Sequence, residues 1–280
     1  MGDTDYALGR TNAEYDRLIE QAELLRPLTE RLLRAAGIGA GMHVLDVGCG
    51  VGDVSFLVSE LVGCDGSVVG VDLDADAVRL ADERRAALGI TNLVFRVADA
   101  RSVDCGRLFD AAVGRLVLMY LSNPTAALRR IAEKVRPGGT LAFHEWVATI
   151  SPASAMNQPV LASCRDLIRA TFERSGARLE IGAELYRRMR DAGLEPEPRP
   201  LAEIAVCIGQ GAVGYRRWAL LGRSMLPKMV EYGIAAEDEI RDAFERRLRD
   251  ELIDTRDLVP LSSMMIGQWA RKPHAEPGGV

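Results

Sequence analysis

The chain has 280 residues, 48% of them hydrophobic, and its 35 basic and 40 acidic side chains give a formal net charge of -5 at pH 7. A chain of this length and apolar content can bury a full core, so disorder is not expected. The slightly acidic balance, without long blocks of one sign, disfavours nucleic acid as a partner.

The sequence carries no signal for secretion, membrane insertion or metal binding. Residues 1–6 are polar and acidic, and no apolar run follows them, which argues against a secretory signal. No stretch approaches the roughly 18 apolar residues that span a bilayer. The five cysteines and three histidines are scattered and form neither a disulfide framework nor a metal-ligand pattern. We expect a cytoplasmic protein without a membrane partner or a metal.

The first half of the chain alternates between helical and strand patterns. Apolar residues at helical spacing predict an amphipathic helix from Asn12 to about Ala36, which Gly37 ends. Strands are expected at 43–47, 67–72, 92–97, 109–114 and 140–146, and helices at 53–62, 75–88 and 124–135. This alternation is typical of an α/β protein with a parallel sheet and crossover helices.

After Trp146 the alternation breaks. Helices are expected around 160–175, 183–192, 214–231 and 236–253, and strands at 199–208 and 259–269. Composition does not shift enough to define a second domain, so we expect a single domain over 1–280. Within it we expect a helical leader at 1–37, a cofactor-binding core at 38–147, and helical insertions at 148–192 and 210–256 that form a lid over the substrate.

The segment from Val44 to Asp53, VLDVGCGVGD, joins a buried-strand pattern to a tight glycine turn. Glycines let the backbone approach a ligand closely, and the following helix N-terminus offers unpaired N–H groups. Asp72 closes the next apolar run, where its carboxylate can accept hydrogen bonds from both ribose hydroxyls. This pairing predicts a pocket for an adenosine-containing cofactor.

The glycine spacing separates two classes of cofactor. The dinucleotide fingerprint is G-x-G-x-x-G, whereas Gly48, Gly50 and Gly52 stand at alternate positions here. Asp46, two residues before the first glycine, suits a ligand with a cationic ammonium group better than a pyrophosphate. The sequence DVGCGVG resembles motif I of the class I methyltransferases that use S-adenosylmethionine.

The resemblance carries motifs over roughly residues 12–147, where RPGGTLAF at 136–143 is similar to the turn that enters the fifth strand in this class. It implies a Rossmann-like, doubly wound α/β fold with a mostly parallel seven-stranded sheet and helical lid insertions. It also implies S-adenosylmethionine as the cofactor and S-adenosylhomocysteine as the product.

Ligands of an open parallel sheet bind outside the carboxyl ends of the strands. The resemblance implies that Asp72 binds the ribose, that Asp99 and the Ala100 backbone hold the adenine amino group, and that Leu73 packs on the ring. Acids at strand ends also cap helices, which is the alternative for both. The full predicted cofactor-binding set is Tyr6, Gln21, Asp46, Gly48, Cys49, Gly50, Asp72, Leu73, Asp99, Ala100, Arg115 and Leu116.

Three of these residues rest on other patterns. Tyr6 and Gln21 belong to a leader that resembles the segment folding over the cofactor in small-molecule methyltransferases of bacterial type. Arg115 breaks an apolar run at the expected end of the fourth strand. Its charge can pair with a carboxylate of the cofactor, of the substrate or of a neighbouring acid, or it can be solvated.

His144 and Glu145 are the predicted catalytic residues, because they lie on a strand whose end should face the acceptor. An imidazole titrates near neutral pH and can act as a general base, although a structural, hydrogen-bonded histidine is the alternative. General-base help is about 10²–10⁴-fold, whereas positioning can supply roughly 7–11 kcal/mol. Positioning should therefore dominate.

We expect methyl transfer from S-adenosylmethionine to a small, partly apolar molecule, similar to ubiquinone/menaquinone-biosynthesis and natural-product methyltransferases. Carbon or oxygen is favoured as the acceptor atom because a base is available, and nitrogen is possible; a homodimer is also possible. One alternative is an NAD(P)-dependent oxidoreductase, but its third glycine and its Tyr-x-x-x-Lys pair are absent. The other is a non-catalytic S-adenosylmethionine-binding protein.

Overall fold

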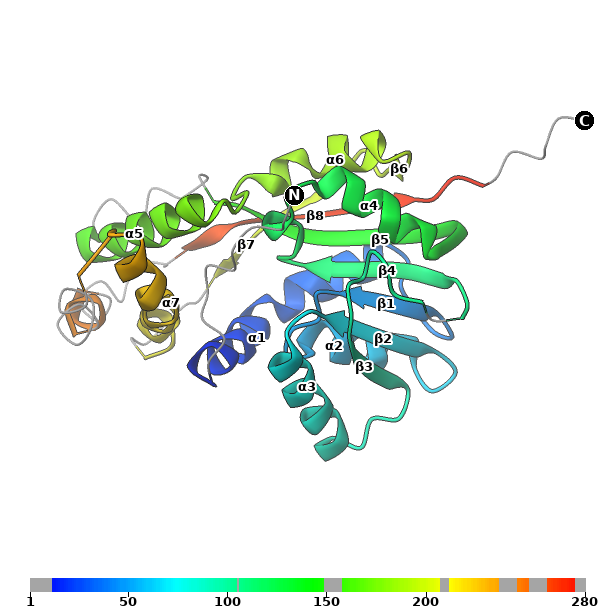
Figure 1. The fold of residues 1–280 in the computed structure, drawn as a ribbon, viewed down its shortest axis with the longest axis horizontal. Helices are drawn as coiled ribbons and strands as arrows, with labels where there is room; N and C mark the ends of the chain where they lie inside the picture. Colours follow the sequence, from blue (N-terminus) through cyan, green and yellow to red (C-terminus); the bar gives the residue numbers. More distant parts are fainter. Residues whose placement is uncertain are drawn as a thin grey trace, which may run out of the picture.

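The computed structural model is built on one eight-stranded sheet (Figure 1) and describes residues 12–104, 106–148, 158–206, 212–236, 246–251 and 261–274. The strand order is β3-β2-β1-β4-β5-β8-β6, and β7 also pairs with β8. The strands are β1 (His43–Val47), β2 (Ser67–Asp72), β3 (Leu93–Val97), β4 (Phe109–Arg115), β5 (Val135–Val147), β6 (Glu195–Pro196), β7 (Leu201–Val206) and β8 (Leu261–Arg271).

Strands β1 to β5 pair in parallel, whereas β8 runs antiparallel to β5, β6 and β7. The chain order reverses between β1 and β4. Ligands of open α/β sheets bind at such a switch point, outside the carboxyl ends of the strands. The topology confirms the predicted doubly wound, mostly parallel α/β fold.

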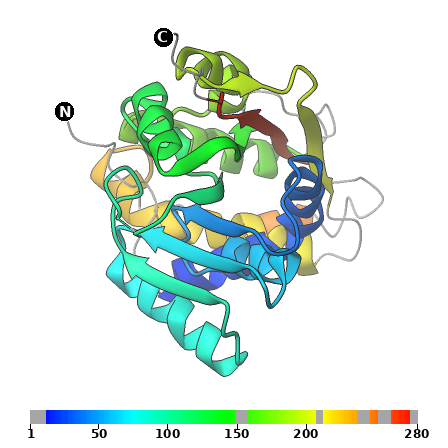
Figure 2. The ribbon, with the colours of Figure 1, turned by 90° about the vertical axis from the view of Figure 1, so that its right-hand side faces the viewer.

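Helices cover both faces of the sheet. The described helices include α1 (Asn12–Ala35), α2 (Asp53–Val62), α3 (Ala75–Ala87), the 3₁₀ helix η1 (Leu118–Tyr120), α4 (Pro124–Glu133), α5 (Pro159–Ser175), α6 (Ile181–Asp191) and α7 (Ala212–Glu231). Helices α1 and α2 pack on one face and α4 and α6 on the other, and Figure 2 shows α1 (blue) and α4 (green) on opposite sides. None of the described helices is long and apolar enough to cross a membrane.

Side chains of β1 alternate between two apolar cores, as the period of two in a strand requires. Val44 packs on the α2 side with Val58, and Leu45 packs on the α4 side with Leu128. Because both faces are covered, the whole strand is buried, which is typical of the centre of a parallel sheet. The same alternation places Asp46 on the α2 side.

Helices α5 and α7 lie beyond the carboxyl ends of the parallel strands, at the left of Figure 1. Helix α7 packs against both α1 and α5. It contributes Leu221, Met225 and Met229 to the same apolar core as the α4 side of the sheet. The two helices thus stand over the end of the sheet where a ligand is expected.

The structure differs from the prediction mainly at the edges. The sheet has eight described strands instead of seven because a two-residue strand that the sequence did not predict, β6, precedes the strand expected at 199–208. The expected strand is β7, and both pair with β8. Pro196 ends β6, and Pro198 and Pro200 lie between β6 and β7. A proline has no N–H for a ladder hydrogen bond. Within the helix expected at 236–253, only residues 246–251 lie in the described part apart from Ala236, and they are helical.

Strand β5 also begins earlier than expected. Val135 pairs with Phe109, and the next pair joins Thr140 to Ala111, so a register shift takes up the intervening Pro-Gly-Gly segment. A Cβ at Gly139 would lie 2.6 Å from the Asp110 carbonyl oxygen. The predicted turn is therefore a bulge inside the strand, at a place where backbones approach too closely for a side chain.

Close packing of β2 against α2 gives a stability prediction. A Cβ at Gly70 would lie 2.7 Å from both the Phe95 ring and the Ser55 hydroxyl. We expect Gly70→Ala to lower the free energy of unfolding by about 1–3 kcal/mol through overpacking, measured by urea denaturation. Gly222→Ala is the control: nothing lies within 4 Å of its added Cβ, so this helical site should gain up to about 1 kcal/mol. Equal stability of the two variants would contradict the packing argument.

Candidate functional site

The turn between β1 and α2 has a backbone that only glycine adopts readily. Gly48, Gly50 and Gly52 have φ values of 67°, 51° and 95°, in the left-handed region that disfavours a side chain. A Cβ at Gly48 would lie 2.6 Å from Val117, whereas a Cβ at Gly50 would meet nothing within 4 Å. The turn therefore packs against the chain after β4 on one side and borders open space at Gly50.

Asp72, at the end of β2, is fixed between this turn and the start of α3. Its Oδ2 accepts a hydrogen bond from Gly50 N at 2.8 Å, and its Oδ1 accepts one from Asp74 N at 2.9 Å. A carboxylate oxygen can accept a second bond, so both remain able to receive hydroxyl donors. Leu73 follows with its side chain 58% exposed, which leaves an apolar surface beside the carboxylate.

Asp99 follows β3 and is held by a residue that the sequence did not single out. Arg101 donates to both carboxylate oxygens, with Nε–Oδ1 at 2.9 Å and Nη2–Oδ2 at 2.6 Å, and its backbone N donates to Oδ1 at 2.8 Å. Hydrogen bonding to Arg101 lowers the pKa of Asp99, so this carboxylate stays ionised. The sequence signal that could have identified Arg101 is a basic residue two positions after an acid at a strand end.

Asp46 lies beneath the glycine turn. Its Oδ2 accepts a hydrogen bond from Ser55 Oγ at 2.6 Å, while Oδ1 is buried without a partner in the described part of the chain. Burial raises the pKa of Asp46 to about 7, against the opposing effects of Ser55 and Arg115. Cys49, in the turn itself, is 7% exposed, and burial raises the pKa of its thiol.

Arg115 ends β4 and reaches the same region. Its Nη1 donates to Thr29 Oγ1 of α1 at 3.2 Å, and among the described residues it forms no ion pair. Burial lowers its pKa, although Asp53 and Asp46 attract the cation. Leu116 comes next with a φ of 55°, the one positive value at a described non-glycine residue. Such backbone strain persists only where the surroundings enforce it, often at functional sites.

The two predicted catalytic residues accept hydrogen bonds from the backbone that follows β4. The His144 carbonyl accepts from Leu116 N at 2.9 Å, and Glu145 Oε1 accepts from the backbone N–H groups of Val117 and Leu118 at 2.9 and 2.8 Å. Consecutive residues of β5 thus hold three consecutive N–H groups after β4. These bonds enforce the strained backbone of Leu116.

Neither His144 nor Glu145 lines the cleft at the carboxyl ends of the strands. His144 is 1% exposed, and burial with Arg115 and Arg31 nearby lowers its pKa to about 3. Glu145 is fully buried, and burial raises its pKa to about 7. The physical reason is that β5 continues to Val147, so this pair lies between β4 and β8 rather than at a free strand end. This placement does not favour the predicted role as a base facing the acceptor.

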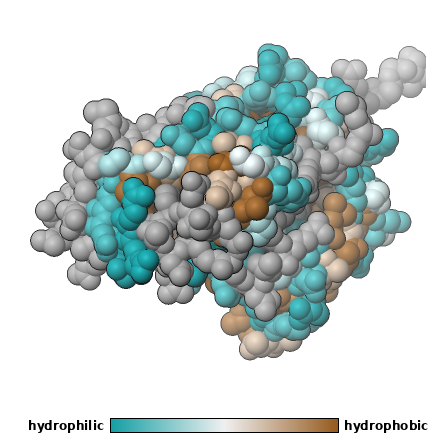
Figure 3. All heavy atoms as spheres, turned by 60° about the vertical axis from the view of Figure 1, so that its left-hand side comes forward, coloured by the Kyte–Doolittle hydropathy of each residue, from teal (hydrophilic) through white to brown (hydrophobic). Residues whose placement is uncertain are grey.

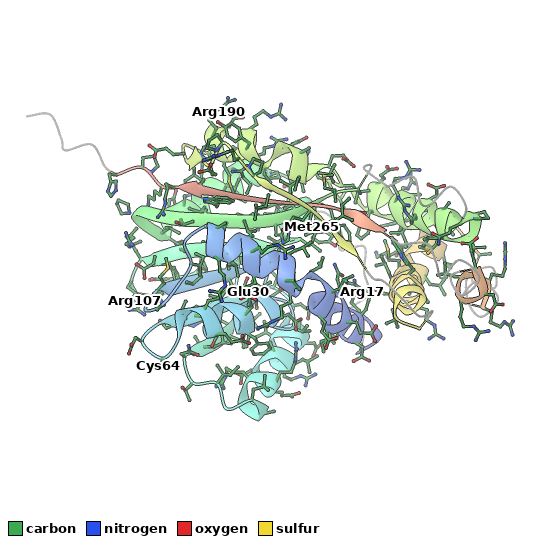
Figure 4. The ribbon with its side chains drawn as sticks, turned by 180° about the vertical axis from the view of Figure 1, so that it is seen from behind. Arg17, Glu30, Cys64, Arg107, Arg190 and Met265 are labelled. Carbon is green, nitrogen blue, oxygen red and sulfur yellow. The ribbon has the colours of Figure 1, made fainter. Side chains whose placement is uncertain are left out.

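Helix α1 forms another wall, through side chains that its sequence spacing places on one face. Glu14 and Arg17 form a buried ion pair at 2.6 Å, Arg17 also donates to Gln21, and Ser224 of α7 donates to Glu14. Figure 4 shows Arg17 near the start of α1, on the side of the molecule where α5 and α7 lie. Of the two predicted leader contacts, Gln21 reaches the site, whereas Tyr6 lies outside the described residues.

These walls enclose the cleft, which has a volume of about 920 Å³. This volume is near the upper end of the roughly 300–1,000 Å³ found for ligand sites. Of the predicted residues, the cleft is lined by Gln21, Gly48, Cys49, Gly50, Asp72, Leu73, Asp99, Ala100, Arg115 and Leu116. Residues not predicted include Glu14, Tyr15, Arg17, Arg101, Tyr120, Leu121, Trp146 and Lys228. Figure 3 brings the end of the molecule with α5 and α7 forward and shows hydrophilic and hydrophobic residues side by side.

Comparison with known proteins gives a family and a fold. A family model described as a methyltransferase domain matches residues 38–193. The chain is 32% identical over 138 residues to aklanonic acid methyltransferase DauC of Streptomyces sp. (strain C5), covering 49% of this chain and 62% of that protein. It is 32% identical over 120 residues to nocamycin O-methyltransferase of Saccharothrix syringae, covering 42% and 43%. The chain thus spans about half the length of these curated relatives.

Solved structures show the same fold at low sequence identity. YcgJ of Bacillus subtilis has a TM-score of 0.57 at 17% identity, covering 88% of this chain and 98% of YcgJ. The [4+2]-cyclase SpnF has a TM-score of 0.53 at 21% identity, covering 89% of this chain and 82% of SpnF. At these identities the likeness extends to the fold alone.

The buried carboxyl of Glu145 gives a pH prediction. A raised pKa means that the folded state holds the proton more tightly, so this group's contribution to stability is present below the usual value of 4.5 and is lost as pH rises to about 7. Glu145→Gln keeps an oxygen for the two N–H groups and removes the titration. Its stability relative to the unaltered protein should therefore rise between pH 4.5 and 7.5 by more than about 1 kcal/mol, because one pKa unit is worth about 1.4 kcal/mol.

Urea denaturation at several pH values measures this difference. His144, whose lowered pKa acts in the opposite direction, is present in both proteins and cancels. Glu145→Leu is the companion variant: it leaves two N–H groups without their acceptor and should be destabilising at every pH by about 1–3 kcal/mol or more. A stability difference for Glu145→Gln that does not change with pH would contradict the assignment.

Proposed function

Because the chain belongs to the methyltransferase domain family, we propose that it transfers a methyl group from S-adenosylmethionine to a small, partly apolar molecule. The Asp72 carboxylate carries this proposal: it is fixed by Gly50 N at the carboxyl ends of the strands and faces a cleft of about 920 Å³. An acid held in this way can accept both hydroxyls of a ribose.

The residues around Asp72 fit the rest of the cofactor. The exposed side chain of Leu73 offers an apolar surface for the adenine ring, and Asp99 with Ala100 lines the same cleft and can accept the adenine amino group. Gly48, Cys49 and Gly50 border the space for the methionine part. Arg115, which has no ion pair within the described part of the chain, would bind the cofactor carboxylate.

Helix α1 and the lid would enclose the acceptor. Tyr120, Leu121 and Trp146 line the cleft, and the rings of Tyr120 and Trp146 pack on Phe172 of α5 with centroids 6.5 and 6.1 Å away. Aromatic walls of this kind favour a flat, partly apolar molecule. The names of the two relatives above, aklanonic acid methyltransferase and nocamycin O-methyltransferase, support a small-molecule acceptor.

The proposed mechanism relies on positioning and exclusion of water. When bound, S-adenosylmethionine supplies an electrophilic methyl group on a sulfonium. The chain would hold the acceptor atom in line with this methyl group and cover the site with α1, α5 and α7. Positioning and exclusion of water would supply most of the rate enhancement. Because His144 and Glu145 lie outside the cleft lining, the case for carbon or oxygen over nitrogen no longer rests on them.

Calorimetric titration with S-adenosylmethionine, S-adenosylhomocysteine and NADH tests the cofactor. We expect both sulfur compounds to bind and NADH not to bind. A screen of flat, partly apolar acceptors with a labelled methyl donor then tests transfer. Binding of NADH alone would overturn the proposal in favour of an oxidoreductase, and cofactor binding without transfer to any acceptor would favour a non-catalytic binding protein.

A single substitution tests the ribose contact. Asp72→Asn replaces one carboxylate oxygen by an amide nitrogen that does not accept hydrogen bonds. We expect S-adenosylhomocysteine to bind about 10–100-fold more weakly, because hydrogen bonds to charged groups contribute about 1.5–3 kcal/mol. The control Asp76→Asn lies in the helix that follows, with its side chain 71% exposed, and should leave the affinity unchanged. Equal affinities for both variants would remove Asp72 from the ribose site.

A further inference from the structure

Three side chains form a hydrogen-bonded chain from the cleft into the interior. Arg115 Nη1 lies 3.2 Å from Thr29 Oγ1, and the same oxygen lies 3.3 Å from His144 Nδ1. Thr29 and His144 are 2% and 1% exposed, so water does not compete for these contacts. The chain joins β4, α1 and β5, three elements that are distant in sequence.

The Thr29 hydroxyl fixes the direction of every bond in this chain. Its Oγ1 also lies 3.0 Å from the Leu25 carbonyl oxygen, which can only accept, so the one hydroxyl proton points to Leu25. A hydroxyl has two acceptor sites, and Arg115 and His144 occupy them. His144 must then donate its own proton from Nδ1, and burial keeps the imidazole in its neutral form.

A neutral imidazole at this place leaves the positive charge of Arg115 intact. Thr29 uses one guanidinium N–H, and the guanidinium has five. His144 also holds the backbone that follows Arg115, because Leu116 N donates to the His144 carbonyl. His144 therefore orients Arg115 through its ring and through its main chain, without neutralising it.

We propose that Thr29 and His144 are positioning residues that hold Arg115 for the carboxylate of the bound cofactor. This rests on the function proposed above and goes beyond it, because it makes helix α1 a determinant of selectivity for a carboxylate-bearing donor. Neither residue touches the ligand; both act through the guanidinium.

The test compares S-adenosylmethionine with its decarboxylated analogue, which lacks only the carboxylate. For the unaltered protein we expect the complete cofactor to bind about 10-fold or more tightly than the analogue. Thr29→Val keeps the shape and removes the hydroxyl. It should weaken binding of the complete cofactor about 5–10-fold and change the affinity for the analogue less than about 2-fold. Thr29→Ser should restore the preference.

Thr171 of α5 offers a matched control. It is fully buried, and its Oγ1 donates to the Leu167 carbonyl at 2.7 Å, the same bond within a helix that Thr29 makes to Leu25. It does not line the cleft. Thr171→Val should therefore leave both affinities unchanged while it loses the same kind of hydroxyl. If Thr29→Val does not fold, His144→Phe removes the ring donor and should reduce the same preference.

Equal weakening of both ligands by Thr29→Val would mean a scaffold role and would overturn the proposal, as would no effect on either. No binding of either ligand to the unaltered protein would instead remove the cofactor assignment itself. ¹⁵N NMR of the His144 ring is an independent readout. A proton on Nδ1 is expected, and a proton on Nε2 alone would contradict the direction of the bond from His144 to Thr29.

Discussion

The Asp72 carboxylate connects two turns on which the whole site depends. One oxygen binds the backbone of the glycine turn after β1, and the other binds the backbone at the start of α3. Parallel strands bring these turns side by side, and the carboxylate fixes their spacing. A charged acceptor bonded to backbone N–H groups is both stronger than a neutral one and fixed in direction. Its remaining acceptor capacity faces the cleft.

A second support lies at the corner after β4, where a strained Leu116 follows Arg115. Successive residues of β5 hold the N–H groups of Leu116, Val117 and Leu118. This arrangement has an energetic cost, because Glu145 keeps one buried oxygen without a partner among the described residues, and such a group costs about 1–3 kcal/mol. Asp46 beneath the glycine turn shows the same feature. Stability is thus lowered at two places that fix the shape of the cleft.

Helix α1 connects the two halves of the site. In its first turns, Glu14 and Arg17 line the cleft, and Glu14 also accepts a hydrogen bond from Ser224 of α7. The Tyr15 hydroxyl donates to Asp74 at 3.3 Å, at the start of α3. Further along the same helix, Thr29 reaches Arg115. A single helix therefore contacts α7, the start of α3 and the end of β4.

The sequence determined the central elements and the cofactor motifs. Strands β1 and β2 and helix α2 have the predicted bounds, because buried apolar runs, a glycine turn and a strand-end acid are local patterns. Most of the predicted cofactor residues line the cleft for the same reason. Local pattern missed the two-residue edge strand β6, and it predicted a turn at the Pro-Gly-Gly segment, which is a bulge in β5.

Only the tertiary structure decided whether the side chains of His144 and Glu145 face the cleft. Their exposure depends on how far β5 extends and on what packs against it, and β8 comes from more than 100 residues later in the chain. The bonds of Thr29 to Arg115 and His144 likewise join residues 86 and 115 positions apart. A hydroxyl in a helix has no sequence signal for such partners. Their contacts follow from packing between elements, which local periodicity does not encode.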